Sequence, residues 1–408
     1  MDELPIGRRV AYWRSRRHMS QQVFADRMGK SKSWVDKVER GVRRLDKFSV
    51  LHEIADVLHV DVQLLLGRDV SRSPDAGTGV DQVEVQEIRS ALERYDQISA
   101  FFYPPPEPPP LDQIVQSVSH AWQTYERAKY RVLARALPTL LRQAQAADTA
   151  NAGGGHAREA AHLLGQVYQI SSAVLRKLGE YELAWLAADR SIAVSQRADD
   201  PLLAGTAAYR VSLALLALGR ARPALEVNLN IANRLAPTGP ATKPEQVSVY
   251  GVLLLAAALA AARLADAASV RDLLVEAGDA AQALGGDHDH YWTSFGPTNV
   301  QLHRVAALVE LGEGRLAVEV GDSLDRAAFD MLVPERRACF HIDMARALTQ
   351  GGDIARAAEM LLEADRVASA EVRCRPVAHQ VLADVARRAR GAPPPMLVEL
   401  AAMLGVPA

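Results

Sequence analysis

The feature that most constrains the fold of this chain is a repeated pattern of alanine-rich segments separated by short turns. Equivalent turns lie at Gly179, Gly219, Gly312 and Gly352, and the spacing is 40 residues from the first to the second and from the third to the fourth. A further turn at 263–266 divides the interval between Gly219 and Gly312. Glycine readily adopts the left-handed conformation that commonly ends a helix. The pattern therefore predicts an array of helix pairs that occupies most of the chain.

The array resembles the tetratricopeptide repeat, in which two helices form one unit. Its 40-residue spacing is longer than the usual period of roughly 34 residues, so a HEAT-like arrangement stays open. Either resemblance implies a right-handed α-solenoid with a concave groove, which we expect over residues 111–408. The first helix of each pair lines the concave side of such repeats. The helices around Tyr168, Tyr209, Tyr250 and His303 are therefore expected to face inward.

Composition is typical of a soluble protein from a reducing compartment. Apolar residues make up 49% of the 408 residues, and mean hydropathy is −0.06. The most apolar run, from Val252 to Ala262, is shorter than the roughly 20 residues that span a bilayer. Cys339 and Cys374 are the only cysteines and form no CxxC pair. We expect a cytoplasmic protein with no signal peptide and no membrane span.

Charge is distributed unevenly along the chain. Residues 1–72 contain 15 lysines and arginines against 10 aspartates and glutamates, a net charge of +5. The whole chain carries −2, so residues 73–408 carry −7. A small basic head on an acidic body indicates that the head binds a polyanion such as nucleic acid.

The first 67 residues have the spacing of five short helices. Apolar residues recur three or four positions apart, with polar residues placed to cap helix starts and glycines placed to end them. The expected caps are Ser20, Ser31, Asp46 and Asp61, and the expected ends are Gly29, Gly41 and Gly67. The two short helices on either side of Gly29 predict a helix-turn-helix.

This region resembles the Cro/C1-type (XRE) family of helix-turn-helix domains over about residues 4–67. The resemblance rests on IGRRV at 6–10, Arg14, SQQVFA at 20–25, SKSWV at 31–35 and VERG at 38–41. Trp13 and His18 depart from the family, which usually has leucine and glycine there. The family implies that Arg14 and Glu39 form a partly buried ion pair, which orients the third helix without touching DNA.

In this motif the second helix rests on the DNA backbone and the third enters the major groove. The third helix carries lysines that can donate to guanine, and an aspartate that either accepts from a cytosine amine or holds the lysines in place. By resemblance, the glutamine that starts the second helix and the arginines after the third contact phosphates. The predicted DNA-binding residues are Gln21, Gln22, Lys32, Ser33, Trp34, Asp36, Lys37, Arg40, Arg43 and Arg44. The alternative is a degenerate domain whose charged helix face is merely solvated.

A linker is expected between the head and the array, which gives domains at 1–67, 68–110 and 111–408. Its first part, 68–79, is rich in Ser, Pro, Asp and Gly, a composition that predicts flexibility. Its last part, 103–110, contains six prolines and predicts a stiff extended spacer.

One connecting helix is expected in the middle of the linker, within 81–102. Its apolar residues follow a spacing of about three to four, and they are Val85, Ile88, Leu92, Tyr95 and Phe102. That spacing predicts either a two-helix dimer seam or a face that packs on the body.

No set of residues predicts catalysis or a metal centre. Gly29-Lys30-Ser31 resembles the end of a phosphate-binding loop, but Phe24 stands where that loop requires an earlier glycine. Asp287-His288-Asp289-His290 lacks the support of a metal motif and is typical of a polar turn. We therefore expect no enzyme activity, no cofactor and no metal.

Residues 291–304 are the main candidate for an effector site, because three aromatic residues lie close together beside a Gly-Pro pair that breaks the helix. Alternatively, Trp292 and Phe295 fill a gap where the superhelix bends. The predicted ligand-binding residues are Tyr209, Arg210, Tyr291, Asn299, His303 and Arg304. Asn228, Asn230 and Asn233 are a weaker candidate, because they fall on the second helix of a pair.

The order of domains resembles that of the Rgg/PlcR/PrgX-like peptide-sensing regulators of bacteria. The resemblance implies a transcriptional regulator that binds a pseudopalindromic DNA operator as a homodimer. It also implies that the repeats sense a peptide or small-molecule effector, as in quorum sensing. The alternative is a DNA-binding factor whose repeats recruit another protein and bind no small ligand. A broad exposed apolar patch would favour that alternative, whereas aligned Asn, Arg and aromatic residues in the groove would favour the effector.

Overall fold

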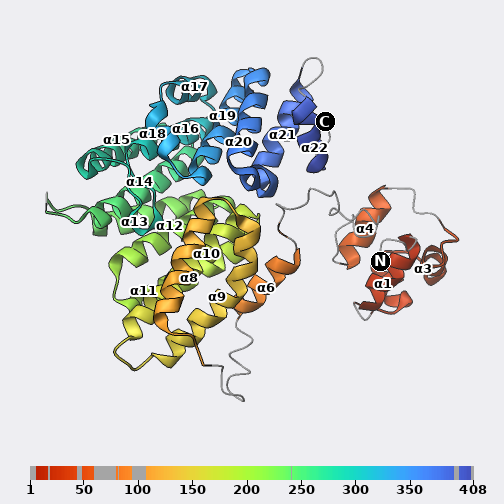
Figure 1. Cartoon of the computed structure of the whole chain (residues 1–408). Coiled ribbons are helices and arrows are strands. Elements are labelled where there is room, and N and C mark those ends of the chain that lie inside the picture. Colours follow the sequence, from red (N-terminus) through yellow and green to blue (C-terminus); the bar gives the residue numbers. More distant parts are fainter. Residues whose placement is uncertain are drawn as a thin grey trace. The chain divides into compact units, whose positions relative to one another are not determined.

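Figure 1 shows the computed structural model of the chain, which describes residues 6–16, 19–43, 48–58, 80, 82–93, 107–239, 241–389 and 395–405. Within these ranges the fold is all-α, and the one β-type interaction is a bridge between His288 and Phe295. The predicted fold class is therefore confirmed. The chain divides into two compact units, Met1–Gly77 and Thr78–Ala408.

The described part of the N-terminal unit contains four helices, α1 (Ile6–Arg16), α2 (Gln21–Arg27), α3 (Lys32–Glu39) and α4 (Phe48–Leu58). Their inward side chains form a small apolar core that includes Val10, Phe24, Val35, Ile54 and Leu58. The predicted fifth helix, between Asp61 and Gly67, lies outside the described residues.

Local hydrogen bonds determine where α2 and α3 begin. The hydroxyl oxygens of Ser20 and Ser31 accept hydrogen bonds from the backbone N–H groups of Val23 and Trp34, both at 3.2 Å. Each serine thereby satisfies a donor that the first turn of a helix leaves free. Gly29 has a φ of +59° and closes the turn between the two helices. These caps and this turn confirm the prediction.

Gly7 allows α1 to cross α3 at very close range. A Cβ atom on Gly7 would lie 2.0 Å from the carbonyl oxygen of Val38 and 3.3 Å from that of Glu39. Only a residue without a side chain fits at this crossing. The crossing holds α3 in place from behind.

The C-terminal unit is a stack of helix pairs with one connecting helix before them. Its described elements are α6 (Gln82–Glu93), α8 (Leu111–Glu126), α9 (Tyr130–Ala150), α10 (Ala157–Lys177), α11 (Tyr181–Ala198), α12 (Pro201–Ala217), α13 (Ala221–Leu235), α14 (Pro244–Arg263), α15 (Ala267–Leu284), η1 (His290–Trp292), α16 (Pro297–Glu310), α17 (Gly314–Asp322), α18 (Arg326–Met331), α19 (Pro334–Gly351), α20 (Ile354–Cys374), α21 (Pro376–Arg388) and α22 (Pro395–Met403).

The first helix of each pair contacts the first helix of the next pair. Helix α10 contacts α8 and α12, α14 contacts α12 and α16, and α16 contacts α19. Each first helix also packs against its own second helix, as in α10 with α11 and α14 with α15. This stacking is that of a tetratricopeptide-like α-solenoid, in which the first helices form the inner layer.

The turns between paired helices share one backbone conformation. Gly179, Gly219, Gly312 and Gly352 have φ values of +83°, +75°, +81° and +85°. At the equivalent turn before α15, Ala265 takes the same left-handed region with a φ of +58°. The predicted equivalence of the four glycine turns is confirmed. Ala265 adopts the same conformation although its Cβ atom makes that conformation unfavourable.

Helix α14 is long and apolar enough to cross a membrane by length and composition alone. It has 20 residues, and its most apolar 18-residue window has a mean hydropathy of 1.6, so the apolar stretch exceeds the run at 252–262. However, 83% of that window is buried, and the helix contacts α12, α13, α15 and α16. A helix that is apolar on every side is what the centre of a helical stack requires.

Helix α6 packs on the body. Its apolar residues Val85, Ile88 and Leu92 are buried in the same core as α8 and α9. The backbone carbonyl of Ala91 accepts a hydrogen bond from the side chain of Gln145 at 3.1 Å. Of the two alternatives for this segment, packing on the body is the observed one, and Tyr95 and Phe102 lie outside the described residues.

The stack curls until helices that are far apart in sequence meet. Helix α8 of the first pair contacts α19 of a late pair, and the two regions lie side by side in Figure 1. The hydroxyl of Tyr130 in α9 donates a hydrogen bond to Glu371 in α20. The concave side is therefore filled by side chains from both ends of the stack.

Candidate functional site

The outward face of α3 carries the residues predicted to read DNA. Lys32, Ser33 and Lys37 are exposed, whereas Val35 and Val38 point into the core. This division is the one that a recognition helix needs, because its apolar stripe anchors it while its polar stripe faces the groove.

A buried carboxylate links α3 to the two helices before it. Glu39 is 5% exposed and accepts hydrogen bonds from Arg14 Nε at 2.6 Å and Arg14 Nη2 at 3.1 Å. Gln21 Nε2 donates to the same carboxylate at 2.8 Å. The ion pair implied by the family resemblance is thus present. Gln21 is committed to it through one N–H, which leaves one N–H for a phosphate.

Other predicted DNA-contacting residues have partners within the domain. Asp36 pairs through one carboxylate oxygen with Arg40 at 2.5 Å, which leaves its other oxygen as an acceptor. Gln22 donates to Asp26 at 2.8 Å. These exposed contacts are weak enough for DNA to replace them.

Trp34 and Arg43 lie together at the end of the motif. Trp34 is half-buried against the core, and the guanidinium of Arg43 lies 6.0 Å from the centre of its ring. This cation–π contact holds an exposed cation near α3. Arg44, predicted to contact phosphate, lies outside the described residues.

Four of the six predicted ligand-binding residues are buried inside the body. Tyr209 and Arg210 lie on α12, and Asn299 and His303 lie on α16. Tyr291 and Arg304 are half-buried. Helices α12 and α16 are first helices of their pairs, so these side chains belong to the inner layer of the stack.

Arg210 is 4% exposed and lacks a carboxylate partner in the described part of the chain. Its guanidinium lies 5.1 Å over the ring of Trp122 and 5.0 Å over the ring of Tyr209, and its Nε has no hydrogen-bond partner. Burial lowers the pKa of Arg210, and the nearby cations Arg336 and Arg176 lower it further.

The same cations act on the neighbouring tyrosine and histidine. Burial alone would raise the pKa of Tyr209, but Arg336, Arg210 and Arg176 outweigh it and lower that pKa below its ordinary value. Burial, with help from Arg336, lowers the pKa of His303 to about 4. His303 is therefore neutral at pH 7, and one of its ring nitrogens bonds to the carbonyl oxygen of Asn299 at 2.9 Å.

Asn299 is fully buried, and both polar atoms of its side-chain amide lack a partner in the protein. An unsatisfied buried amide costs free energy, so native proteins almost always provide it with a partner. Its position on the inner layer makes it a natural contact for a bound molecule or an ordered water.

The segment between α15 and α16 brings aromatic side chains into the concave side. Three of its non-glycine residues, Tyr291, Trp292 and Ser294, have positive φ values of +52°, +58° and +49°. The ring of Trp292 stacks on that of Trp122 at 5.7 Å, and the Tyr291 hydroxyl donates to Asp200 at 3.0 Å. Strained backbone of this kind persists only where the surroundings enforce it.

The polar residues of this segment shape the loop. Asp287 accepts hydrogen bonds from the backbone N–H of Thr298 at 3.0 Å and from its hydroxyl at 2.5 Å. Asp289 accepts from the backbone N–H of Ser294 at 2.8 Å. Phe295 is fully buried against Gly251 of α14, so this aromatic fills the core.

The body contains at least two cavities. The smaller, about 210 Å³, includes Tyr291, Trp292, His162 and Gln166 in its lining. The larger, about 520 Å³, lies between α8 and α9 and contains none of the predicted ligand-binding residues.

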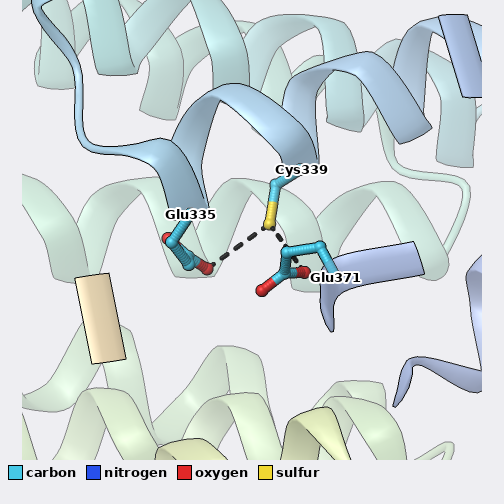
Figure 2. A group of neighbouring side chains, drawn as sticks. All are labelled: Glu335, Cys339 and Glu371. Atoms are coloured by element: carbon cyan, nitrogen blue, oxygen red, sulfur yellow. Dashed lines mark hydrogen bonds between the residues drawn. The ribbon is translucent and has the colours of Figure 1, made fainter. Parts of the chain in front are cut away.

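Sequence reasoning missed a cluster of Glu335, Cys339 and Glu371, whose oxygen and sulfur atoms lie within 4.8 Å of one another (Figure 2). Such a donor set suits a metal, but the ammonium of Lys177 already fills its centre. Lys177 Nζ donates to Glu335, to Glu371 at 2.7 Å and to the sulfur of Cys339 at 3.2 Å. Arg375 adds a hydrogen bond to Glu371 at 2.9 Å.

The electrostatics of this cluster favour an internal ion pair over a metal site. Burial raises the pKa of Cys339 to about 12, so the thiol stays protonated and is a poor metal ligand. Burial alone would raise the pKa of Glu335 and Glu371, but Lys177 keeps both below their ordinary values. Lysine and its carboxylates are 158 and 194 residues apart, which is why no local pattern reveals them.

Comparison with known proteins identifies one domain at the start of the chain. A family described as "Helix-turn-helix domain" matches residues 5–66. No curated protein matches the chain. A solved structure that is similar is that of PlcR from Bacillus thuringiensis in complex with the peptide PapR7 and DNA, at 14% identity and a TM-score of 0.34, over 68% of this chain and 95% of that chain. Because this similarity is low, the description of the body rests on its own helices and their contacts. The chain thus carries a helix-turn-helix domain at residues 5–66, and a tetratricopeptide-like stack of helix pairs follows it in the sequence.

Proposed function

We propose that this protein is a sequence-specific transcriptional regulator whose helical-repeat body senses an effector. The observation that carries the proposal is the exposed polar face of α3 within a matched helix-turn-helix domain. Lysine on such a face donates to guanine O6 and N7 in the major groove. The basic head and acidic body are consistent with one unit on DNA and the other in solution.

Six of the ten predicted DNA contacts have a stated role in this proposal. Lys32, Ser33 and Lys37 face base edges, and Arg40, Arg43 and Arg44 contact phosphates. Arg14 and Glu39 position α3, because their ion pair joins it to α1. We further propose that two copies of the chain bind a pseudopalindromic operator in the cytoplasm of a bacterium.

The test begins with duplexes selected from a random library by the full-length protein. The double variant Lys32→Ala, Lys37→Ala is expected to lose about 1–3 kcal/mol of operator binding for each base contact removed. Arg43→Ala is expected to weaken operator and random DNA alike and to reduce the salt dependence of binding. Lys243→Ala, which alters an exposed lysine of the body, is the matched control. Operator affinity unchanged in the Lys32, Lys37 variant would refute the assignment of α3.

The sensing role rests on the inner layer of the body. Arg210 and Asn299 have buried polar atoms without partners, and both lie on inner helices. We propose that a peptide or small molecule contacts them together with Tyr209 and His303. Such a ligand acts on transcription only if it binds one arrangement of the DNA-binding heads more tightly than another.

A further inference from the structure

We propose that the effector carries an oxyanion, a carboxylate or a phosphate, and that Arg210, Arg176 and Arg336 hold it at the centre of the body. This inference rests on the proposed sensing function and gives it a ligand chemistry. It follows from the balance of charge on the inner helices, from the Arg210 Nε that has no acceptor in the described residues, and from the neutral polar groups on α16.

Basic side chains outnumber available carboxylates in this region. The basic ones are Arg176, Lys177, Arg210, Arg336 and Arg375, and the carboxylates that form ion pairs with them are Glu335 and Glu371. Asp343 also lies near Arg375, but it pairs with Arg346 at 3.1 Å. Both carboxylates are already occupied. Glu371 is bound by Lys177 and Arg375, and Glu335 by Lys177 with Arg336 at 3.5 Å. The cluster therefore retains unbalanced positive charge.

Glu126, which lies near Arg336, forms no ion pair with these cations in the described part of the chain. Burial and a hydrogen bond with Asp289 raise its pKa to about 8, so at neutral pH it is mostly protonated. Within the described ranges, no carboxylate lies at ion-pair distance from Arg210 or Arg176. A buried cation without a counter-ion is costly, and a bound anion removes that cost.

The surroundings of Arg210 suit an oxyanion. Trp122 and Tyr209 hold its guanidinium by their ring faces and leave its N–H edge without an acceptor at Nε. A guanidinium edge binds two oxygens of a carboxylate or phosphate side by side. Tyr209 lies among the same three arginines, and its hydroxyl can donate to an oxyanion as well.

Neutral polar groups on the inner helix α16, where His303 lies close enough to Arg336 to feel its charge, can bind the rest of such a ligand. His303 is uncharged at pH 7, and the amide of Asn299, one helical turn away, has a free donor and a free acceptor. The oxyanion is thus the charged end of a molecule whose remaining part meets neutral hydrogen-bonding groups.

Thermal unfolding of the full chain tests the proposal with four probes at equal ionic strength. These are inorganic phosphate, succinate, a pool of short peptides with free carboxyl termini, and the same pool with amidated termini, with sodium chloride as the reference. An oxyanion probe at about 100 times its Kd should raise Tm by about 5 °C in a saturable manner. Comparing phosphate, succinate and the free-terminus pool distinguishes the source of the anion.

Arg210→Met is the decisive variant, because methionine can keep the contact with Trp122 while it removes the charge. It should abolish the rise in Tm with the oxyanion, and it should leave the Tm of the ligand-free protein unchanged or higher. Arg271→Met, at an exposed arginine of α15, should change neither. A marked fall in the ligand-free Tm of Arg210→Met would show that Arg210 has a structural partner and would overturn the proposal.

The failure of this inference is distinguishable from the failure of the sensing role. A rise in Tm with the amidated pool that survives Arg210→Met would overturn the oxyanion and retain the sensor. No saturable rise with any probe would overturn both, while DNA binding through α3 is measured independently.

Discussion

Gly7 and Gly278 show that glycine has different structural roles at different positions of this chain. A side chain at Gly7 would collide with the backbone of α3, whereas a Cβ at Gly278 in α15 would meet nothing within 4 Å. The first glycine is a packing requirement, and the second only adds freedom to a helix interior. Sequence alone does not separate them, because the difference lies in what another helix places opposite.

We therefore predict opposite effects for alanine at the two positions. Gly7→Ala should force α1 away from α3, destabilise the N-terminal unit by about 1–3 kcal/mol and weaken DNA binding. Gly278→Ala should stabilise the body by up to about 1 kcal/mol. Chemical denaturation of both variants, with DNA titration of the first, provides the measurement. Equal effects at the two sites would contradict the crossing described here.

Glu126 predicts a pH dependence of stability. Its pKa of about 8 in the folded protein is above the ordinary value of 4.5, so the folded state holds a proton that the unfolded state releases. The unfolded state binds fewer protons between these values, and stability should fall as pH rises through this window.

Melting temperatures between pH 6.5 and 8.5 test this, because the pKa values of His303 and His341, both lowered by burial to about 4, place their effects at lower pH. Tm should decline across the range, and Glu126→Gln should remove part of that decline. Glu319→Gln, at an exposed glutamate, is the control and should leave the slope intact. A slope that is the same in Glu126→Gln would rule out a shared proton between Glu126 and Asp289.

Among the secondary-structure elements, those set by local chemistry were predictable and those set by distant partners were not. Ser20, Ser31 and the turn glycines act within a few residues, so their roles can be read along the sequence. The apolar face of α6 could pack either on a second copy of the helix or on the body, and the spacing of its apolar residues does not distinguish the two. Lys177 is an ordinary lysine near the end of a helix until α19 and α20 surround it.

The cluster around Lys177 should be strongly coupled to the stability of the body. Lys177→Met leaves two buried carboxylates facing each other and should cost about 3–5 kcal/mol of the free energy of unfolding. Adding Glu335→Gln and Glu371→Gln to that variant removes the repulsion and should restore much of the loss. Arg387→Met, which breaks an exposed pair with Asp384, should cost about 0–1 kcal/mol. Urea denaturation measures all of these, and a small cost for Lys177→Met would mean that water enters the cluster.

For the molecule as a whole, the sequence predicted a head, a linker and an array at 1–67, 68–110 and 111–408, whereas α6 of that linker belongs to the same compact unit as the array. It also suggested a more open concave face than the structure has. The sequence placed four predicted ligand contacts on inner helices, and the structure has them there: Tyr209, Arg210, Asn299 and His303. Arg210 is covered by Trp122 of α8, a helix that also contacts α19 near the other end of the stack. The sequence of a single repeat does not reveal such a contact between distant helices.

A single helix-turn-helix head buries little DNA surface, so two copies are expected on each operator. The half-sites should be centred about 34–36 Å apart, or a multiple of that, along the duplex. Sedimentation velocity of the protein with a selected operator should give two chains per duplex. One chain per operator at saturation would contradict the homodimer.

The meeting of the two ends of the stack has a consequence for synthesis on the ribosome. Open solenoids gain stability repeat by repeat, because each repeat contacts only its neighbours. Here Tyr130 finds Glu371, its partner, 241 residues later in the chain. Contacts of such separation slow folding and leave early segments exposed to other chains. The growing chain carries Lys177 without Glu335 for 158 residues and without Glu371 for 194, so the first helices are made well before the partners that complete their core.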